Sequence, residues 1–116
     1  MARQVVKLGN LTEADITKQI KDYLESQGWH GIRLQSGTVL GLTRGTFMRL
    51  GKKGIPDWIF VRKLAYCFVE MKAPGKKLSM DQEKWFTWAM ERGFPCLWAD
   101  GLGSFLIKWS TIKLAV

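Results

Sequence analysis

The spacing of apolar residues along the chain changes several times, and each change predicts a different element. After Thr12 the apolar residues recur at helical intervals, Asp15 supplies part of a capping box, and a glycine closes the segment, so we expect a helix over residues 12–28. Ser79 opens a second segment of the same kind, which predicts a helix over residues 79–93. Two amphipathic helices therefore bracket the middle of the chain.

Short runs rich in Val, Ile, Phe, Tyr and Trp predict β-strands between and after these helices. Two of them, residues 58–61 and 65–71, are connected through Arg62 and Lys63 and are suited to the centre of a mixed sheet. Further strands are expected at residues 29–35, 95–99 and 104–109. The pattern predicts one compact α/β domain over residues 1–116.

Residues 37–54 form a glycine-rich basic segment with five glycines, four basic residues and no acid. The segment is compatible with an irregular hairpin or with a flexible loop. It contains neither a Walker loop nor a dinucleotide-binding fingerprint, but a flexible backbone with basic side chains suits contact with phosphates. A solvated basic loop is the alternative. The nucleic-acid-binding candidates, including two lysines beyond the central strands, are Arg44, Arg49, Lys52, Lys53, Lys76 and Lys77.

The net charge of the chain points to the kind of partner. The chain carries 18 Lys and Arg against 10 Asp and Glu, a net charge of +8. Residues 26–80 hold ten of the basic residues and two of the acids, so the whole surplus lies in this middle part. A basic surplus of this size in a small domain indicates a polyanionic partner.

The rest of the composition excludes several classes of protein. An apolar share of 47% argues against a disordered polyelectrolyte. No apolar run reaches the length of a membrane span, and the N-terminus lacks the apolar stretch of a signal peptide. Cys67 and Cys96 lie in apolar segments without zinc-ligand spacing, so we expect two buried thiols and a reducing, cytoplasmic location.

The two acids of the basic stretch, Asp57 and Glu70, fall at the ends of the predicted central strands. If these strands pair as a hairpin, Asp57 at the start of one lies beside Glu70 at the end of the other. Strand alternation places Glu70 and Lys72 on one face and Met71 on the other. An ordinary charged strand end is the alternative, since Glu-x-Lys alone is common there. Gly-x-Pro-Asp before one strand and Glu-x-Lys at the end of the next make a more specific pattern.

Two carboxylates and an ammonium at one end of a sheet suit metal-assisted hydrolysis of a phosphodiester. Mg²⁺ or Mn²⁺ takes oxygen ligands, which Asp57, Glu70 and the Met71 carbonyl would supply. The ion would activate a water and offset charge on the phosphate. Lys72 would orient or deprotonate that water and stabilise the developing charge.

Three segments carry a resemblance to a known family: residues 54–57 (Gly-Ile-Pro-Asp), residues 70–72 (Glu-Met-Lys) and Gln82. Together they resemble the VRR-NUC (virus-type replication-repair nuclease) branch of the PD-(D/E)XK nucleases. The resemblance runs from about Glu13 to the end of the second helix, and residues 95–109 fit the family's closing strands. It implies a restriction-endonuclease-like fold, in which helices flank a mixed central sheet.

The resemblance also implies metal-dependent DNA cleavage and assigns roles to residues. Taken by itself, Glu13 is a solvated first-turn acid that favours the helix dipole. The family, however, has a helix-borne glutamate before its core motif, and Glu13 matches it. The implied catalytic set is Lys72, Asp57, Glu70, Glu13 and Gln82, and the implied metal-binding set is Asp57, Glu70, Met71 and Glu13.

Further expectations come by analogy with stand-alone, virus-encoded members of the family. They imply a homodimer that acts on branched DNA such as Holliday junctions, in the host cytoplasm if the chain is encoded by a bacteriophage. Two sites across a twofold axis would suit two symmetric cuts. One alternative is a nuclease of the same superfamily that acts on flaps, duplex or single strands. The other is a basic nucleic-acid-binding module without catalysis.

Overall fold

The computed structural model describes residues 10–34, 37–40, 47–50 and 53–112. Nine elements occupy these residues. In chain order they are α1 (Glu13–Ser26), β1 (His30–Arg33), β2 (Gly37–Leu40), β3 (Phe47–Leu50), β4 (Trp58–Arg62), β5 (Ala65–Met71), α2 (Met80–Glu91), β6 (Cys96–Ala99) and α3 (Leu102–Thr111). None of the helices in these ranges has the length and apolar character needed to cross a membrane.

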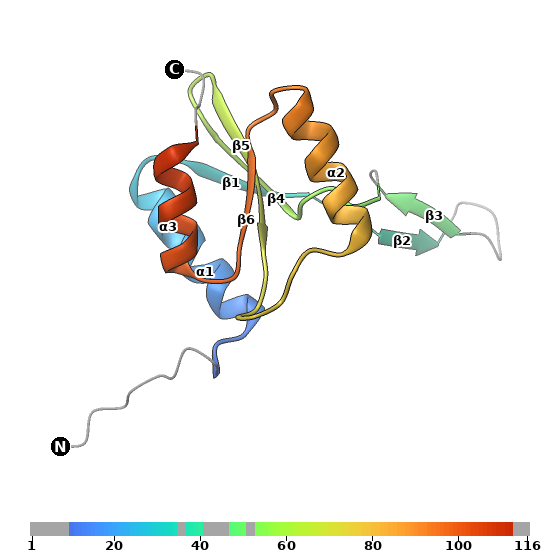
Figure 1. Ribbon diagram of the computed structural model, residues 1–116, viewed down its shortest axis with the longest axis horizontal. Coiled ribbons are helices and arrows are strands. Elements are labelled where there is room, and N and C mark those ends of the chain that lie inside the picture. The colour runs from blue at the N-terminus through green and yellow to red at the C-terminus, as the bar shows by residue number, and fades with distance from the viewer. Residues whose placement is uncertain (1–9, 35–36, 41–46, 51–52, 113–116) are drawn as a thin grey trace.

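Four of the strands form a mixed sheet in the order β1-β4-β5-β6. Strand β4 pairs antiparallel with β1 and with β5, whereas β6 runs parallel to β5. Helices α1 and α3 lie on one side of this sheet and α2 on the other (Figure 1). The expected α/β fold, a mixed central sheet flanked by helices, is confirmed.

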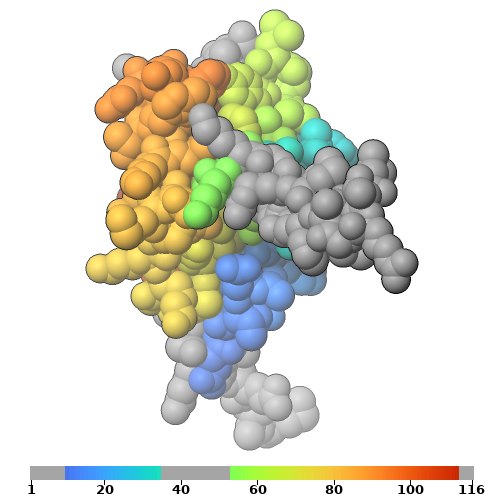
Figure 2. Space-filling model, turned by 90° about the vertical axis from the view of Figure 1, so that its right-hand side faces the viewer, coloured from blue at the N-terminus to red at the C-terminus, as the bar shows by residue number. Residues whose placement is uncertain are grey.

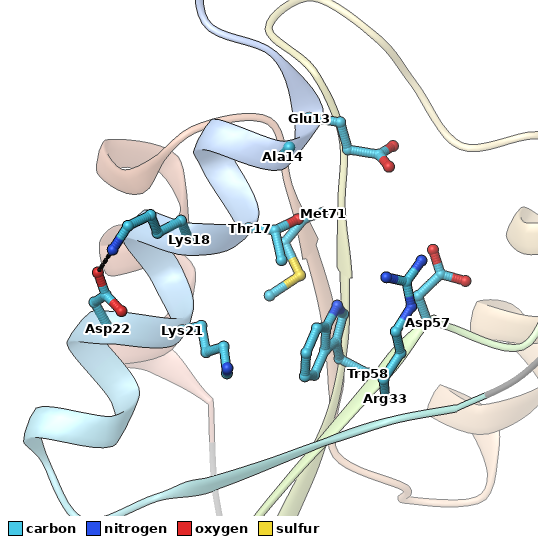
Figure 3. A pocket seen from close by; sticks show the side chains of 10 residues that line it. All are labelled: Glu13, Ala14, Thr17, Lys18, Lys21, Asp22, Arg33, Asp57, Trp58 and Met71. Carbon is cyan, nitrogen blue, oxygen red and sulfur yellow. Dashed lines mark hydrogen bonds and ion pairs between the residues drawn. The ribbon is translucent and has the colours of Figure 1, made fainter.

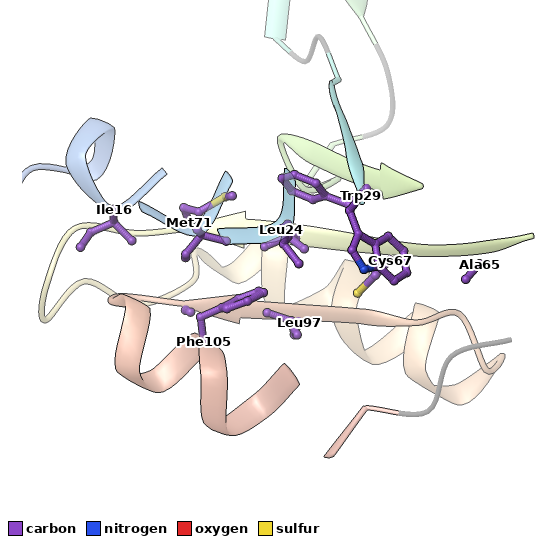
Figure 4. Packing of buried hydrophobic residues seen from close by; sticks show 12 residues of the cluster. Ile16, Leu24, Trp29, Ala65, Cys67, Met71, Leu97 and Phe105 are labelled. Atoms are coloured by element: carbon purple, nitrogen blue, oxygen red, sulfur yellow. The ribbon is translucent and has the colours of Figure 1, made fainter. Parts of the chain in front are cut away.

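The alternation of strand β5 divides its side chains between the two helical layers. Its odd-numbered residues join the main core under α1 and α3, where the fully buried residues Ile20, Cys67 and Phe105 lie (Figure 4). On the other face, Phe68 packs edge-to-face on Trp85 of α2, at 5.1 Å between ring centroids. Both predicted helices begin with complete capping boxes, at Thr12 and Ser79, which satisfy amide groups that a helix start leaves free.

The expected strand over residues 104–109 is wrong, because this segment belongs to helix α3. Leu102, Phe105, Trp109 and Ile112 follow one another at helical spacing and pack on the main core. The Phe105 and Trp109 rings stack at 5.4 Å between centroids. In the sequence, the apolar residues of this segment resemble a buried strand. The segment is helical because its apolar residues at helical spacing pack together on the main core. The closing strands inferred from the resemblance are therefore one strand, β6, and one helix.

The sequence of the glycine-rich basic segment is compatible with a hairpin or with a loop, and the structure contains the hairpin. Strands β2 and β3 pair antiparallel, with Thr38 opposite Arg49, and they project away from the four-stranded sheet (Figure 1). Two of the predicted DNA-binding residues, Arg44 and Lys52, lie outside the described residues.

Candidate active site

Asp57 and Glu70 meet at one end of the two central strands. Strands β4 and β5 pair antiparallel with Trp58 opposite Val69, so continuing the register by one residue places Asp57 opposite Glu70. The backbone N–H of Asp57 donates a hydrogen bond to Oε1 of Glu70 over 3.0 Å. The predicted juxtaposition of these two acids is thus present in the structure.

Lys72 lies on the same face of the strand end as Glu70, as the alternation predicts. Its Nζ is 3.7 Å from Oε2 of Glu70, and its side chain is 17% exposed. The side chain of Met71 points the other way, into the main core. The N–H of Lys72 donates to the carbonyl of Ala99 over 2.9 Å, which extends the pairing of β5 with β6 beyond the strand and fixes the lysine's backbone.

The carboxyl group of Glu70 is the buried acid of the site, with 2% of the residue exposed. Burial first, and then the Asp57 carboxylate, raise its pKa to about 7 against the opposing effects of the Asp57 N–H and Lys72. The charge of Glu13 also raises the pKa of Glu70, which places this helix-borne acid within electrostatic reach. The site therefore holds more negative charge than its own lysine offsets.

A cavity of about 520 Å³ opens beside these groups, between α1 and strands β1 and β4. Glu13, at the start of α1, and Asp57, directly before β4, both line it, and their carboxylates lie on the same side of the cavity (Figure 3). Thr17 and Lys21 follow Glu13 at intervals of four along the same helical face and line the cavity as well. The helix thus presents Glu13 to the strand end that carries Asp57.

The acids have the donor chemistry that Mg²⁺ or Mn²⁺ requires. Carboxylate and carbonyl oxygens suit these hard cations, and a cation would offset both the burial and the carboxylate repulsion that raise the pKa of Glu70. Among the described residues, no three Asp, Glu, His or Cys side chains gather closely enough to form a metal site. A cation there would therefore need oxygens beyond Asp57 and Glu70, such as the Met71 carbonyl and water.

Gln82 does not line the cavity but caps helix α2. Its Oε1 accepts a hydrogen bond from the Ser79 N–H over 2.9 Å, and its own N–H donates to Oγ of Ser79 over 3.2 Å. The first turn of α2 nevertheless touches the segment that leads to Asp57. Gly54 has φ of +85°, and a Cβ added to it would strike the backbone of Asp81. Figure 2 shows this segment before β4, in green, against the start of α2.

The predicted DNA-binding lysines occupy different surroundings. Lys53 forms an ion pair with Asp81 over 3.1 Å, whereas Lys76 and Lys77 are exposed on the segment between β5 and α2. Arg49 belongs to strand β3. Arg33 and Trp58 also line the cavity with the acids, although no sequence motif marks them. For Trp58, the position directly after Asp57 is a sequence signal that it lies close to the site. Arg33 has no such signal.

A helix-flanked mixed sheet with an acidic pair and a lysine at the ends of its central strands defines the class of PD-(D/E)XK nucleases. A family model described as the VRR-NUC domain matches residues 43–101, just over half of the 116-residue chain. The chain belongs to the VRR-NUC family, and this domain implies a DNA-binding nuclease. The match includes Asp57, Glu70 and Lys72 and begins after helix α1. No curated protein and no solved structure matches the chain.

Proposed function

We propose that this nuclease is a Mg²⁺- or Mn²⁺-dependent DNA endonuclease whose active site is the end of strands β4 and β5. The single observation that carries the proposal is the hydrogen-bonded pair of Asp57 and Glu70, with Lys72 within 3.7 Å of Glu70. Two acids and a lysine held by adjacent strands bring oxygen ligands and a cation to one reaction centre.

Asp57, Glu70 and the carbonyl of Met71 would hold the metal. Glu13 does not gather with the other two acids in this structure, so it would join them only by moving toward the bound cation. When bound, Mg²⁺ or Mn²⁺ supplies a Lewis acid and positive charge at the scissile phosphate. Lys72 orients the attacking water through a hydrogen bond from Nζ and stabilises negative charge that develops on the phosphate. Gln82 supports the site by fixing the first turn of α2, on which the segment before Asp57 rests.

The basic stretch brings DNA to a site that would otherwise repel it. Arg44, Arg49 and Lys52 of the glycine-rich segment and the exposed Lys76 and Lys77 contact the phosphate backbone in this proposal. The ion pair of Lys53 with Asp81 is exposed on both sides, so Lys53 can exchange its partner for a phosphate at small cost. These contacts are independent of base sequence.

The substrate in this proposal is branched DNA such as a Holliday junction, cut by a homodimer in the cytoplasm. A domain of 116 residues covers little DNA, and two copies related by a twofold axis would place two sites for symmetric cuts. Simple duplex, flap and single-stranded DNA are the alternatives. A four-way junction, a flap, a duplex and a single strand, incubated side by side with the purified protein and Mn²⁺, separate these substrates. Sedimentation equilibrium measures the oligomeric state.

The test of the chemistry is Lys72→Ala. We expect this variant to fold and bind DNA but to cleave it about 10²- to 10⁴-fold more slowly, the contribution usual for a positioned acid–base group. Lys84→Ala is the matched control, since Lys84 is exposed on α2 away from the site. EDTA should stop cleavage by the wild type and Mn²⁺ should restore it. Cleavage by Lys72→Ala at the wild-type rate would overturn the role of Lys72, and cleavage in EDTA would rule out the metal mechanism. No cleavage by the wild type with Mn²⁺ would leave a non-catalytic DNA-binding module as the better account.

A further inference from the structure

The cavity beside Asp57 contains more than the acids. We propose that it is a nucleotide subsite, in which an unpaired nucleotide of the cleaved strand places its base on the Trp58 ring and a phosphate on Arg33. The subsite rests on the proposed function, because it places the nucleotide next to the Asp57 and Glu13 carboxylates. Its volume of about 520 Å³ lies within the range of small-molecule sites, which is ample for one nucleotide.

Trp58 is a fixed aromatic platform at the cavity wall. The residue is half-buried, and its ring stacks on Phe60, at 5.8 Å between centroids and 19° between planes. Phe60 itself is fully buried in the main core. Because the core already holds the ring, a base that stacks on Trp58 does not have to order it. The Lys21 ammonium lies over the ring, 5.7 Å from its centroid, so the base takes the place of this partly exposed, flexible side chain. Figure 3 shows the indole between Lys21 and Arg33, within the ring of cavity residues.

Among the described residues that line the cavity, Arg33 is the cation without an ion pair. Lys18 and Lys21 also line the cavity and form exposed ion pairs along α1, with Asp22 at 2.7 Å and Glu25 at 3.4 Å. They can add to the attraction for a phosphate, because exchanging an exposed partner costs little, but Arg33 has no such partner to give up among the residues that the structure describes. Within the described part of the chain, no ion pair involves Arg33, and its side chain is exposed. The planar guanidinium offers paired N–H donors that match phosphate oxygens.

The sheet holds this arginine at a set position relative to the acids. Arg33 is paired with Trp58 in the antiparallel ladder of β1 and β4. The next residue, Leu34, donates its N–H to the carbonyl of Asp57 over 2.7 Å. The phosphate-binding group, the stacking platform and a proposed metal ligand therefore move as one unit.

The occupant has to be unpaired. A base within a duplex is stacked and paired, so it enters a side cavity only after it leaves the helix. At a branch point or in a single strand this cost is smallest, so the subsite favours such DNA next to the cut. Aromatic platforms accept any base, because every base has a π-face. The subsite therefore selects unpaired structure and not sequence.

The test compares oligothymidylate with an abasic oligonucleotide of equal length, which has the same phosphates but no bases. Dissociation constants are measured in EDTA by fluorescence anisotropy, so that cleavage is not required. We expect the wild type to prefer oligothymidylate by about 5- to 150-fold, equivalent to about 1–3 kcal/mol for one stacked base. Trp58→Leu should bring the two affinities together, and Trp58→Phe should retain part of the difference.

Trp88→Leu is the matched control, because Trp88 is a half-buried tryptophan of α2 outside the cavity. It should keep the full preference. Arg33→Gln should weaken binding of both oligonucleotides equally and reduce the salt slope by about 0.7, the value for one phosphate contact in a single strand. Equal affinities in the wild type, or an undiminished preference in Trp58→Leu, would overturn the subsite.

A second measurement needs no variant and covers the case that Trp58→Leu does not fold. A single strand that carries iododeoxyuridine is photo-crosslinked to the wild type, and the modified peptide is sequenced. A crosslink at Trp58 is expected, and a crosslink confined to other aromatic residues contradicts the proposal. If base preference depends on Trp58 but no DNA is cleaved with Mn²⁺, the proposed function fails and the subsite stands. Cleavage without base preference removes the subsite alone.

Discussion

The backbone N–H of Asp57 donates a 3.0 Å hydrogen bond to Oε1 of Glu70, which joins the two proposed metal ligands across adjacent strands. This bond favours the charged form of Glu70, but burial and the Asp57 carboxylate outweigh it and raise the pKa of Glu70 to about 7. The strand pairing thus assembles the acids before any cation arrives. It holds them in a state that is electrostatically unfavourable near neutral pH.

This state predicts a pH-dependent stability in the absence of metal. Because the folded protein raises the pKa of Glu70 from 4.5 to about 7, the stabilising protonated form is lost as the pH rises through that window. The free energy of unfolding, measured by urea denaturation in EDTA, should therefore fall between these pH values. Glu70→Gln should remove that fall, since the amide stays neutral. An equal fall in the free energy of unfolding in Glu70→Gln and in the wild type would show that Glu70 is not the group that titrates.

The contact between Gly54 and the start of α2 predicts a difference between two glycines. Gly54 and Gly75 have φ of +85° and +80°, so alanine strains the backbone similarly at both. Only at Gly54 would the new Cβ strike the Asp81 backbone, whereas nothing lies within 4 Å at Gly75. Gly54→Ala should be more destabilising by about 1–3 kcal/mol, as for overpacking in a core. Urea denaturation of both variants gives the comparison, and equal losses would mean that the contact is unimportant.

The helical conformation of α3 predicts different stability effects for two substitutions, Phe105→Ala and Ile107→Ala. In a strand, both residues would lie on the same face. Phe105 is fully buried, and Ile107 is 71% exposed. Phe105→Ala should cost about 3–5 kcal/mol of stability, because it leaves a cavity in the main core. Ile107→Ala should stay within about 0.5 kcal/mol, as surface substitutions usually do. Thermal or urea unfolding measures both, and a large loss at both positions would favour the strand that the sequence suggested.

The exposed lysines between β5 and α2 predict a salt effect. Lys76→Gln and Lys77→Gln should each weaken binding to duplex DNA and reduce the slope of log K against log salt concentration by about one unit per lost phosphate contact. Anisotropy titrations at several salt concentrations give the slope. Glu91→Gln is a control for a charge change on the far end of α2, where the residue is exposed, and it should leave the slope unchanged. An unaltered slope in the lysine variants would show that they do not touch the backbone.

The sequence alone determined the central part of this nuclease. Two apolar runs with a short connection can pair in few ways, and strand alternation then fixes which side chains share a face. Asp57, Glu70 and Lys72 were predictable together for that reason. The two capped helices were predictable because their start signals, at Thr12 and Ser79, are local.

Tertiary structure decided what local spacing could not. The apolar residues of 104–109 suit a strand or a helix, and only their packing on the main core, with Phe105 at its centre, selects the helix. The cavity is lined by side chains from α1, β1 and β4. These elements are far apart in the sequence, so their proximity cannot be predicted from it. Arg33 and Trp58 are 25 positions apart in the sequence and become neighbours through the register of strands β1 and β4. Contacts between distant segments depend on how whole elements pack, and a single sequence does not contain that information locally.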